Sequence, residues 1–143
     1  WERWQGDYAW THASLLRRDP TRYRWFLDQL VVVRDDERTR MGYVTRVAFA
    51  ETGEFALSVA LWPGQPRTIA ARPMSSAFSE ELPMPAILLA ATDEEPATMI
   101  LPPRSFNPGR VLRSMDTGPE RKFRLSRLVQ RGGDFERVAF DES

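Results

Sequence analysis

The chain contains no cysteine, a single histidine and a single lysine. The absence of cysteine excludes disulfides, thiolate-bound zinc and a cysteine nucleophile, and it fits a reducing, cytoplasmic compartment. One histidine, His12, cannot build a histidine-rich metal site, and no serine lies in a nucleophile-elbow motif. The acidic stretches 35–37 and 93–95 lack the spacing of a calcium loop. We therefore expect a protein that is not an enzyme and needs no metal.

Long apolar runs and net charge are also missing. No apolar segment approaches the roughly 18 residues that would span a bilayer, and no signal-like segment is present, so we expect no membrane insertion. Acidic and basic residues number 20 each. The zero net charge leaves no overall field to attract nucleic acid. Because the first residue is Trp1 and not Met, we expect further residues upstream in a longer protein.

Short apolar-alternating runs separated by Gly and Pro fill residues 41–72. They predict three strands, over 41–50, 55–62 and 67–71, that form an antiparallel meander. On the first of these strands we expect one face to point into the core. That face carries Met41, Tyr43, Thr45, Val47 and Phe49.

The rest of the chain is also typical of β-structure. The pair Gly132-Gly133 between two apolar runs predicts a hairpin. Before residue 30 we expect a strand near 8–17, followed by a loop or a single helical turn. After residue 83 the sequence predicts strands over 86–90, 97–101, 110–114, 122–130 and 135–140. The fold class is therefore all-β.

Four of the five tryptophans lie in the first 25 residues, interleaved with arginines. Such aromatic and basic residues can stack on bases or on a guanine-containing ligand. The alternative is that the tryptophans pack on the protein itself, on an upstream segment or on a partner. The candidate partner-binding residues are Trp4, Trp10 and Trp25. Two Arg-x-x-x-Arg spacings, Arg18/Arg22 and Arg34/Arg38, carry little weight in an arginine-rich chain.

Five short segments after position 29 carry a resemblance to a known family. They are Leu30-Val31-Val32-Val33, Gly42-Tyr43-Val44-Thr45-Arg46, Phe55-Ala56-Leu57-Ser58-Val59, Ile100-Leu101-Pro102-Pro103 and Phe106-Asn107-Pro108-Gly109. With them, this part of the chain resembles PilZ-type domains of bacterial signalling proteins. The resemblance implies a PilZ-like antiparallel β-barrel at residues 1–72, a linker or long loop at 73–83, and an additional C-terminal β-hairpin or barrel extension at 84–143.

The same resemblance implies a cyclic di-GMP site made of an Arg-x-x-x-Arg stretch and an Asp/Asn-x-Ser-x-x-Gly motif. That motif fits only residues 7–12, where Asp7 matches but Ala9 replaces the serine and His12 the glycine. The hydroxyl donor is lost, and a Cβ lies where the backbone needs close approach to the ligand. Upstream of Asp7 only Arg3 is available. The ligand motif is therefore eroded.

Three functions follow as hypotheses. The first is a non-enzymatic, degenerate PilZ-like module that acts through contacts with a protein partner or with upstream domains of its own chain. The second is an atypical cyclic di-GMP receptor; its ligand-binding residues would be Arg3, Asp7, His12, Arg17, Arg18 and Arg22. The third is a small β-barrel for single-stranded nucleic acid, which the zero net charge disfavours.

Overall fold

The computed structural model describes residues 1–51, 53–74 and 82–143, and every regular element in these residues is a β-strand. The chain divides into two compact units, Trp1–Trp62 and Pro63–Ser143. All strand pairs are antiparallel. The predicted all-β fold with an antiparallel barrel is confirmed.

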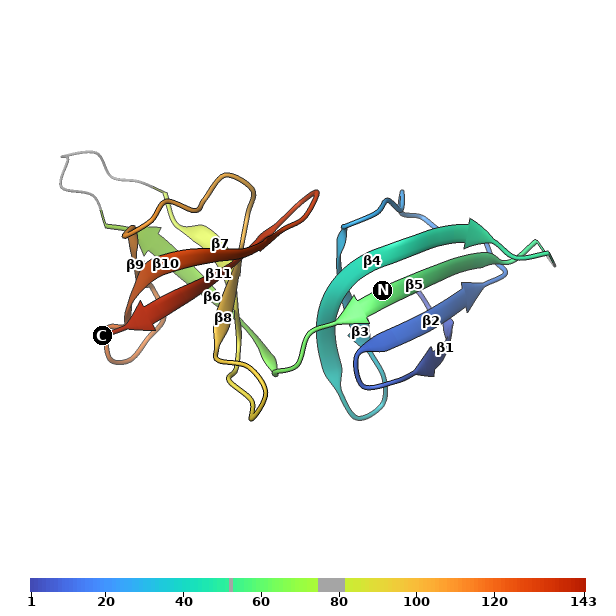
Figure 1. Ribbon diagram of the computed structural model, residues 1–143, viewed down its shortest axis with the longest axis horizontal. Coiled ribbons are helices and arrows are strands. Elements are labelled where there is room, and N and C mark those ends of the chain that lie inside the picture. Colours follow the sequence, from blue (N-terminus) through green and yellow to red (C-terminus); the bar gives the residue numbers. More distant parts are fainter. Residues whose placement is uncertain (52, 75–81) are drawn as a thin grey trace. The chain divides into compact units, whose positions relative to one another are not determined.

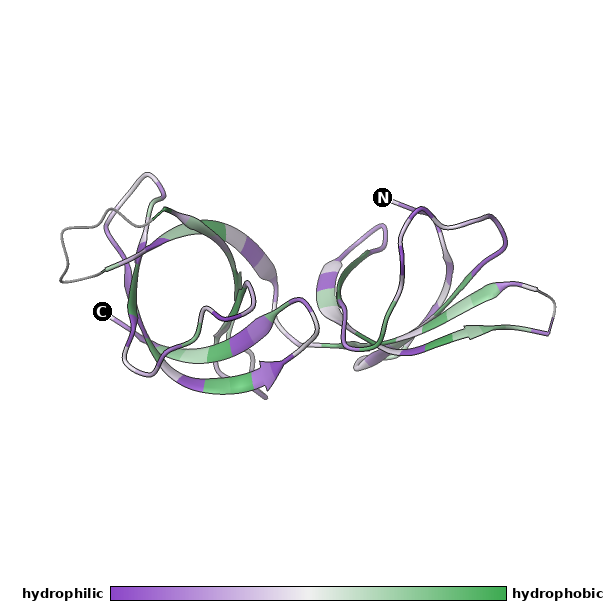
Figure 2. Ribbon diagram, turned by 90° about the horizontal axis from the view of Figure 1, so that it is seen from above, coloured by the Kyte–Doolittle hydropathy of each residue, from purple (hydrophilic) through white to green (hydrophobic). Residues whose placement is uncertain are grey.

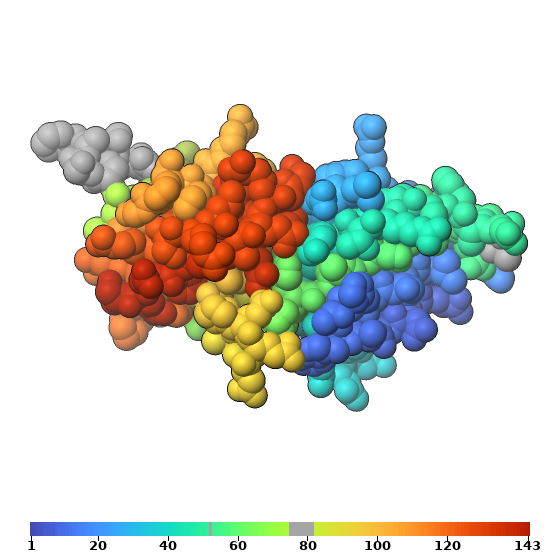
Figure 3. Space-filling model, viewed as in Figure 1, coloured from blue at the N-terminus to red at the C-terminus, as the bar shows by residue number. Residues whose placement is uncertain are grey.

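The N-terminal unit is a five-stranded sheet with the order β1-β2-β5-β4-β3 (Figure 1). In the described residues β1 and β3 each have one neighbouring strand, so this sheet is curved but not closed. Figure 3 shows the first strands, in blue, at the surface of this unit. The strands are β1 (Gln5–Tyr8), β2 (His12–Arg17), β3 (Leu30–Arg34), β4 (Thr39–Phe49) and β5 (Phe55–Leu61).

The core of the N-terminal unit lies on one face of this sheet and is formed by alternate residues of its strands. Its buried members are Ala13, Leu15, Val31, Val44, Leu57, Val59 and Leu61. The expected core face of β4 is therefore partly wrong. Val44 is fully buried, whereas Thr45 and Phe49 are exposed. The register of β4 against β5 shifts between Val44 and Arg46, and such a bulge reverses which side chains face inward.

The C-terminal unit is a closed barrel of six strands in the order β10-β11-β8-β7-β6-β9, seen as a ring in Figure 2. Its interior is apolar and includes Phe123, Leu125 and Val138. All four residues of β8 are buried. The strands are β6 (Pro66–Pro73), β7 (Met84–Leu89), β8 (Thr98–Leu101), β9 (Val111–Ser114), β10 (Lys122–Arg131) and β11 (Glu136–Glu142).

The boundary between the two units does not lie in the linker or long loop that was expected at 73–83. Strand β6 pairs with β7 and β9 and not with β5, so the boundary follows Trp62. The meander prediction is thus right for β4 and β5 and wrong for the third strand. It follows that the C-terminal unit forms the closed barrel, whereas a barrel was expected at 1–72; the sheet in residues 1–62 is open. Residues 75–81 of the expected linker lie outside the described residues.

The predicted positions of individual strands and of the C-terminal hairpin are mostly confirmed. The hairpin around Gly132-Gly133 joins β10 to β11, with Gly132 N donating to Phe135 O at 2.9 Å. The other predicted C-terminal strands correspond to β7, β8 and β9. The expected strand near 8–17 is in fact the hairpin β1–β2, whose turn is closed by the Ala9 N to His12 O bond. Between β2 and β3 the chain has no helical turn.

Candidate interaction site

A pocket of about 440 Å³ opens in the N-terminal unit. Its floor is the sheet core, at Leu15, Leu57 and Val59. Both end strands line it, β1 through Tyr8 and β3 through residues 31–34. Pockets of this size with mostly apolar walls are typical of binding sites. The pocket forms because the segments before β1 and between β2 and β3 cross the core face of the sheet and leave part of that face uncovered.

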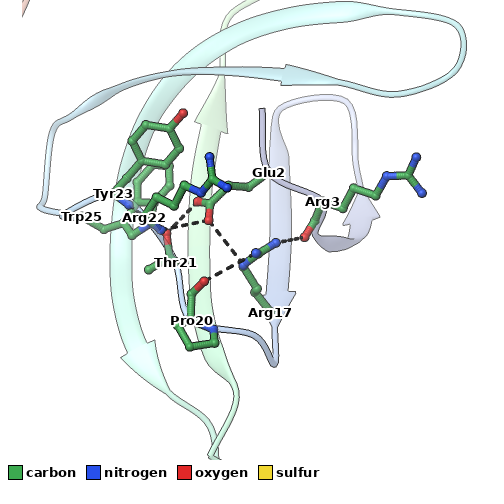
Figure 4. A network of polar contacts seen from close by, with 8 residues as sticks. All are labelled: Glu2, Arg3, Arg17, Pro20, Thr21, Arg22, Tyr23 and Trp25. Atoms are coloured by element: carbon green, nitrogen blue, oxygen red, sulfur yellow. Dashed lines mark hydrogen bonds and ion pairs between the residues drawn. The ribbon is translucent and has the colours of Figure 1, made fainter.

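These two crossing segments are joined through the Glu2 carboxylate (Figure 4). Thr21 Oγ1 donates to Glu2 Oε1 at 2.6 Å, and the Arg22 backbone N–H donates to Oε2 at 3.0 Å. Arg17 Nε lies 3.4 Å from Oε2, and Arg17 also donates to the Arg3 carbonyl at 2.7 Å. The Glu2 side chain is only 6% exposed. This network therefore sets the position of the pocket wall.

Burial by itself would raise the pKa of Glu2. The hydrogen bonds from Thr21 and Arg22, together with the positive charge of Arg17, outweigh burial and hold the pKa below its ordinary value. Glu2 is thus ionised at neutral pH and acts as a fixed acceptor. Its lone pairs are occupied by groups of the protein, so the carboxylate is a structural element of the site.

Glu2→Gln is expected to lower the free energy of unfolding of the N-terminal unit by about 1–2 kcal/mol. The side-chain amide of glutamine has one acceptor oxygen, and its NH2 group cannot accept the second set of hydrogen bonds. A lowered folded-state pKa means that the unfolded chain binds more protons, so the stability contributed by Glu2 is lost as pH falls through that pKa. Urea unfolding by tryptophan fluorescence at neutral and acidic pH measures both effects, since all five tryptophans lie in residues 1–62. Equal acid sensitivity of the variant and the parent would contradict the assignment.

Aromatic rings form one wall of the pocket. Trp25 packs edge-on against Trp4, with ring centroids 5.7 Å apart, and Tyr23 packs on Trp25 at 5.7 Å. Trp25 Nε1 donates to Thr21 Oγ1 at 2.9 Å, which fixes the indole in place. Trp4 also meets Phe55 at 6.0 Å. The structure thus brings together two of the three candidate partner-binding tryptophans, Trp4 and Trp25.

The mouth of the pocket carries one accessible positive charge. The Arg34 guanidinium lies 4.4 Å from the centre of the Trp1 ring, and Trp1 is 73% exposed. Tyr8 of β1 also lines the pocket and is 45% exposed. Burial, with a smaller contribution from the Asp35 carboxylate, raises the pKa of the Tyr8 hydroxyl. Tyr8 of β1 and Arg34 at the end of β3 line the same opening.

Three of the four arginines expected to hold a nucleotide, Arg3, Arg17 and Arg18, line a second cleft of about 420 Å³. Two of them already have internal partners. Arg17 is held by Glu2 and by the Arg3 and Pro20 carbonyls, and Arg18 Nε donates to Glu54 Oε1 at 2.7 Å. The Arg22 side chain does not line this cleft. The cleft is therefore less cationic than its arginine content suggests.

The other two residues expected to bind a nucleotide, Asp7 and His12, lie farther along the β1–β2 hairpin. Asp7 pairs with Ser14 in the β1–β2 ladder, and His12 begins β2 next to the turn. His12 Nδ1 is 2.7 Å from the Thr11 hydroxyl. Neither residue lines the cleft of the arginines. The structure does not assemble Arg3, Asp7, His12, Arg17, Arg18 and Arg22 into one site.

Trp10 lies apart from the pocket, in the turn between β1 and β2. Its ring is 52% exposed and faces two guanidinium groups, those of Arg40 at 4.9 Å and Arg38 at 5.8 Å. Trp10 does not line the pocket. The third candidate partner-binding tryptophan thus belongs to a different surface.

Sequence reasoning missed several residues of the pocket. These are Trp1, Glu2, Tyr8, Tyr23, Arg34 and the valines of β3. The valine run contributed to the resemblance to PilZ-type domains, but no local signal shows that it forms a strand at the end of a sheet. The position of Tyr23 and Glu2 depends on how irregular segments cross the core, which periodicity does not encode.

No helix in the described residues is long and apolar enough to cross a bilayer. Comparison with curated proteins and with solved structures gives no match. A family model described as "FimW C-terminal beta-barrel domain" matches residues 69–143, which is 75 of 143 residues and hence just over half of the chain. The match covers nearly all of the unit that closes into a six-stranded barrel. The chain therefore belongs to the family of the FimW C-terminal β-barrel domain.

Proposed function

We propose that the chain is a cytoplasmic, non-enzymatic, PilZ-like regulatory or adaptor module of a bacterial, pilus-related system that acts through protein contacts. Its contact site is the aromatic pocket between β1 and β3. Membership of the FimW family supports the regulatory role, and the geometry of the N-terminal unit supports the contact site.

The observation that carries the proposal is the gathering of exposed aromatic residues around one opening. Trp1, Tyr8 and Tyr23 line the pocket and are 73%, 45% and 50% exposed. Aromatic side chains that remain exposed beside a preformed apolar pocket are typical of the centre of a protein interface. Glu2, the acidic residue that lines the pocket, is paired with Arg17. An incoming apolar side chain therefore meets few charges that need water.

A photo-crosslinking amino acid placed at Tyr23 in the full chain, in the bacterial cell, tests this site. We expect an adduct with a partner protein from Tyr23 and none from the same crosslinker at Phe49, which is 76% exposed in the same unit but lies outside the pocket. Trp25→Ala is expected to remove the adduct, because a buried aromatic anchor contributes about 2 kcal/mol or more to binding. Trp10→Ala is the matched control and should leave it unchanged.

An atypical cyclic di-GMP receptor is the second candidate, favoured by the cleft that Arg3, Arg17 and Arg18 line. The existing ion pairs of these arginines count against a receptor function. Arg17 is paired with Glu2 and Arg18 with Glu54, so the ligand would have to displace both carboxylates. Calorimetric titration of the full chain with cyclic di-GMP separates the two functions. Micromolar binding that is lost in Arg18→Ala would support the receptor, and absence of heat leaves the contact function.

A further inference from the structure

Strand β3 is an end strand without the usual protection. Natural end strands carry lysines, prolines or bulges that prevent other strands from pairing with them. β3 reads Leu-Val-Val-Val-Arg, and only its last residue is charged. It pairs with β4 over all five residues without a register shift, and Val32 is 42% exposed. An apolar, regular edge of this kind favours the addition of a further strand.

The hydrogen-bond pattern identifies which backbone groups of β3 face outward. Asp35 N donates to Arg38 O at 3.0 Å, so that pair is hydrogen-bonded. In an antiparallel ladder bonded and non-bonded pairs alternate, so Arg34/Thr39 and Val32/Met41 are non-bonded pairs. The Met41 carbonyl indeed accepts from Trp62 N, on the other side of β4. Val32 and Arg34 therefore direct their N–H and C=O groups away from β4, to the side on which β3 has no neighbouring strand in the described residues.

The pocket lies along this same edge. Residues 31–34 of β3 line it, and Tyr8 of β1, the other end strand, lines it as well. A strand added to β3 would place alternate side chains towards the core face, where the cavity of about 440 Å³ has room for one large apolar or aromatic group. The backbone edge and the cavity thus form one continuous receptor.

Charge restricts the occupant further. Arg34 stacks on Trp1, and no carboxylate lies within ion-pair distance of it in the part of the chain that the structure describes. Glu2, the acidic residue of the pocket wall, is fully engaged by Thr21, Arg22 and Arg17. The Asp35 carboxylate near Tyr8 already accepts from the backbone N–H groups of Glu37 and Arg38 at 2.8 and 2.7 Å. Arg34 is thus the charged group at the mouth that is left for a ligand, and it complements an acidic side chain.

We infer that β3 accepts an extended segment of a partner protein as an added strand. The segment inserts one aromatic or aliphatic side chain into the pocket and pairs an acidic residue with Arg34. This inference rests on the proposed contact function and specifies its partner as an acidic-apolar strand.

Val32→Pro in the full chain tests the inference. The substitution removes only an outward-facing N–H, and proline is tolerated at such edge positions, so the β3–β4 ladder remains intact. The probes are synthetic peptides selected against the parent chain from a random phage-displayed library. We expect Val32→Pro to weaken their binding about tenfold or more, and Arg34→Gln to weaken the acidic peptides selectively. Unchanged tryptophan emission and circular dichroism verify the fold of the variant.

A second measurement uses the parent chain alone. Methylation of peptide amides that face β3 should abolish binding, and hydrogen exchange at Val32 and Arg34 should slow when the unmodified peptide binds.

Strand addition is overturned if the peptides bind Val32→Pro as tightly as the parent chain, or if methylated peptides still bind. It is also overturned if the library yields no binder. Self-association of the chain that Val32→Pro abolishes would overturn it as well, since the edge would then belong to a second copy. If Trp25→Ala removes peptide binding while Val32→Pro does not, the contact function stands without strand addition. If neither variant affects binding, both proposals fail.

Discussion

Gly42→Ala is expected to destabilise the N-terminal unit by at least about 3 kcal/mol, because an added Cβ would overlap the Ala60 carbonyl oxygen of the neighbouring strand. The same Cβ would lie 2.8 Å from the Ala60 carbonyl carbon and 3.0 Å from Leu61 Cα. These are backbone atoms in the middle of the β4–β5 ladder, and no rotamer change can move them aside. Urea unfolding followed by tryptophan fluorescence measures the loss, since it reports the N-terminal unit alone.

Gly6→Ala is the matched control, in β1 of the same sheet. Its Cβ would first meet Leu15 Cδ2, at 3.0 Å, and this methyl group belongs to a rotatable side chain. We expect the control to cost less than about 1 kcal/mol. Similar unfolding midpoints for the two variants would show that the β4–β5 contact relaxes and that the close approach at Gly42 is not required.

Glu136→Ala is expected to cost about 3 kcal/mol in the C-terminal unit. Glu136 is 1% exposed, and its Oε1 accepts from the backbone N–H groups of Ser105 and Phe106, both at 2.9 Å. Arg131 Nε donates to Oε2 at 3.1 Å. The carboxylate therefore fastens the segment between β8 and β9 to β11, and alanine leaves two donors without an acceptor. Hydrogen exchange in residues 102–109, which should accelerate strongly, measures the effect locally.

Two comparisons sharpen this prediction. Glu136→Gln keeps one oxygen for the backbone donors and should cost about 1 kcal/mol, while Glu120→Ala breaks only the exposed pair with Arg113 and should cost less than that. Burial alone would raise the pKa of Glu136, but the bonds from Phe106, Arg131 and Ser105 lower it overall. The stability it contributes is therefore lost as pH falls through its folded-state pKa, and Glu136→Gln should flatten this acid dependence. An equal acid dependence in the two proteins would contradict the role.

Strand positions could be predicted from the sequence because alternation and Gly or Pro breaks are local signals. They identified β4, β5 and the β10–β11 hairpin within a few residues. Which strands become neighbours is decided by contacts between distant residues. The run at residues 67–71 was therefore recognised as a strand but assigned to the wrong sheet, since nothing local distinguishes pairing with β5 from pairing with β7.

The site could be predicted only in part for a similar reason. The concentration of tryptophans predicted an interaction surface, and two of the candidate residues, Trp4 and Trp25, do pack against each other. The sequence could not separate Trp10 from them, because that depends on the β1–β2 turn. The bulge near Thr45, which changes the core face of β4, has no signature in the alternation of its residues.

The strand order of the barrel also bears on the order in which the protein can form during synthesis. Every strand of the N-terminal sheet lies within residues 5–61, so this sheet can assemble as soon as that part has left the ribosome. The barrel must wait. β8 pairs with β11, and β10 closes the ring by pairing with β9, and both β10 and β11 follow the other barrel strands in the sequence. Until β10 and β11 are made, the apolar side chains of Met99 and Leu101 lack part of their cover, and the growing barrel is exposed to aggregation.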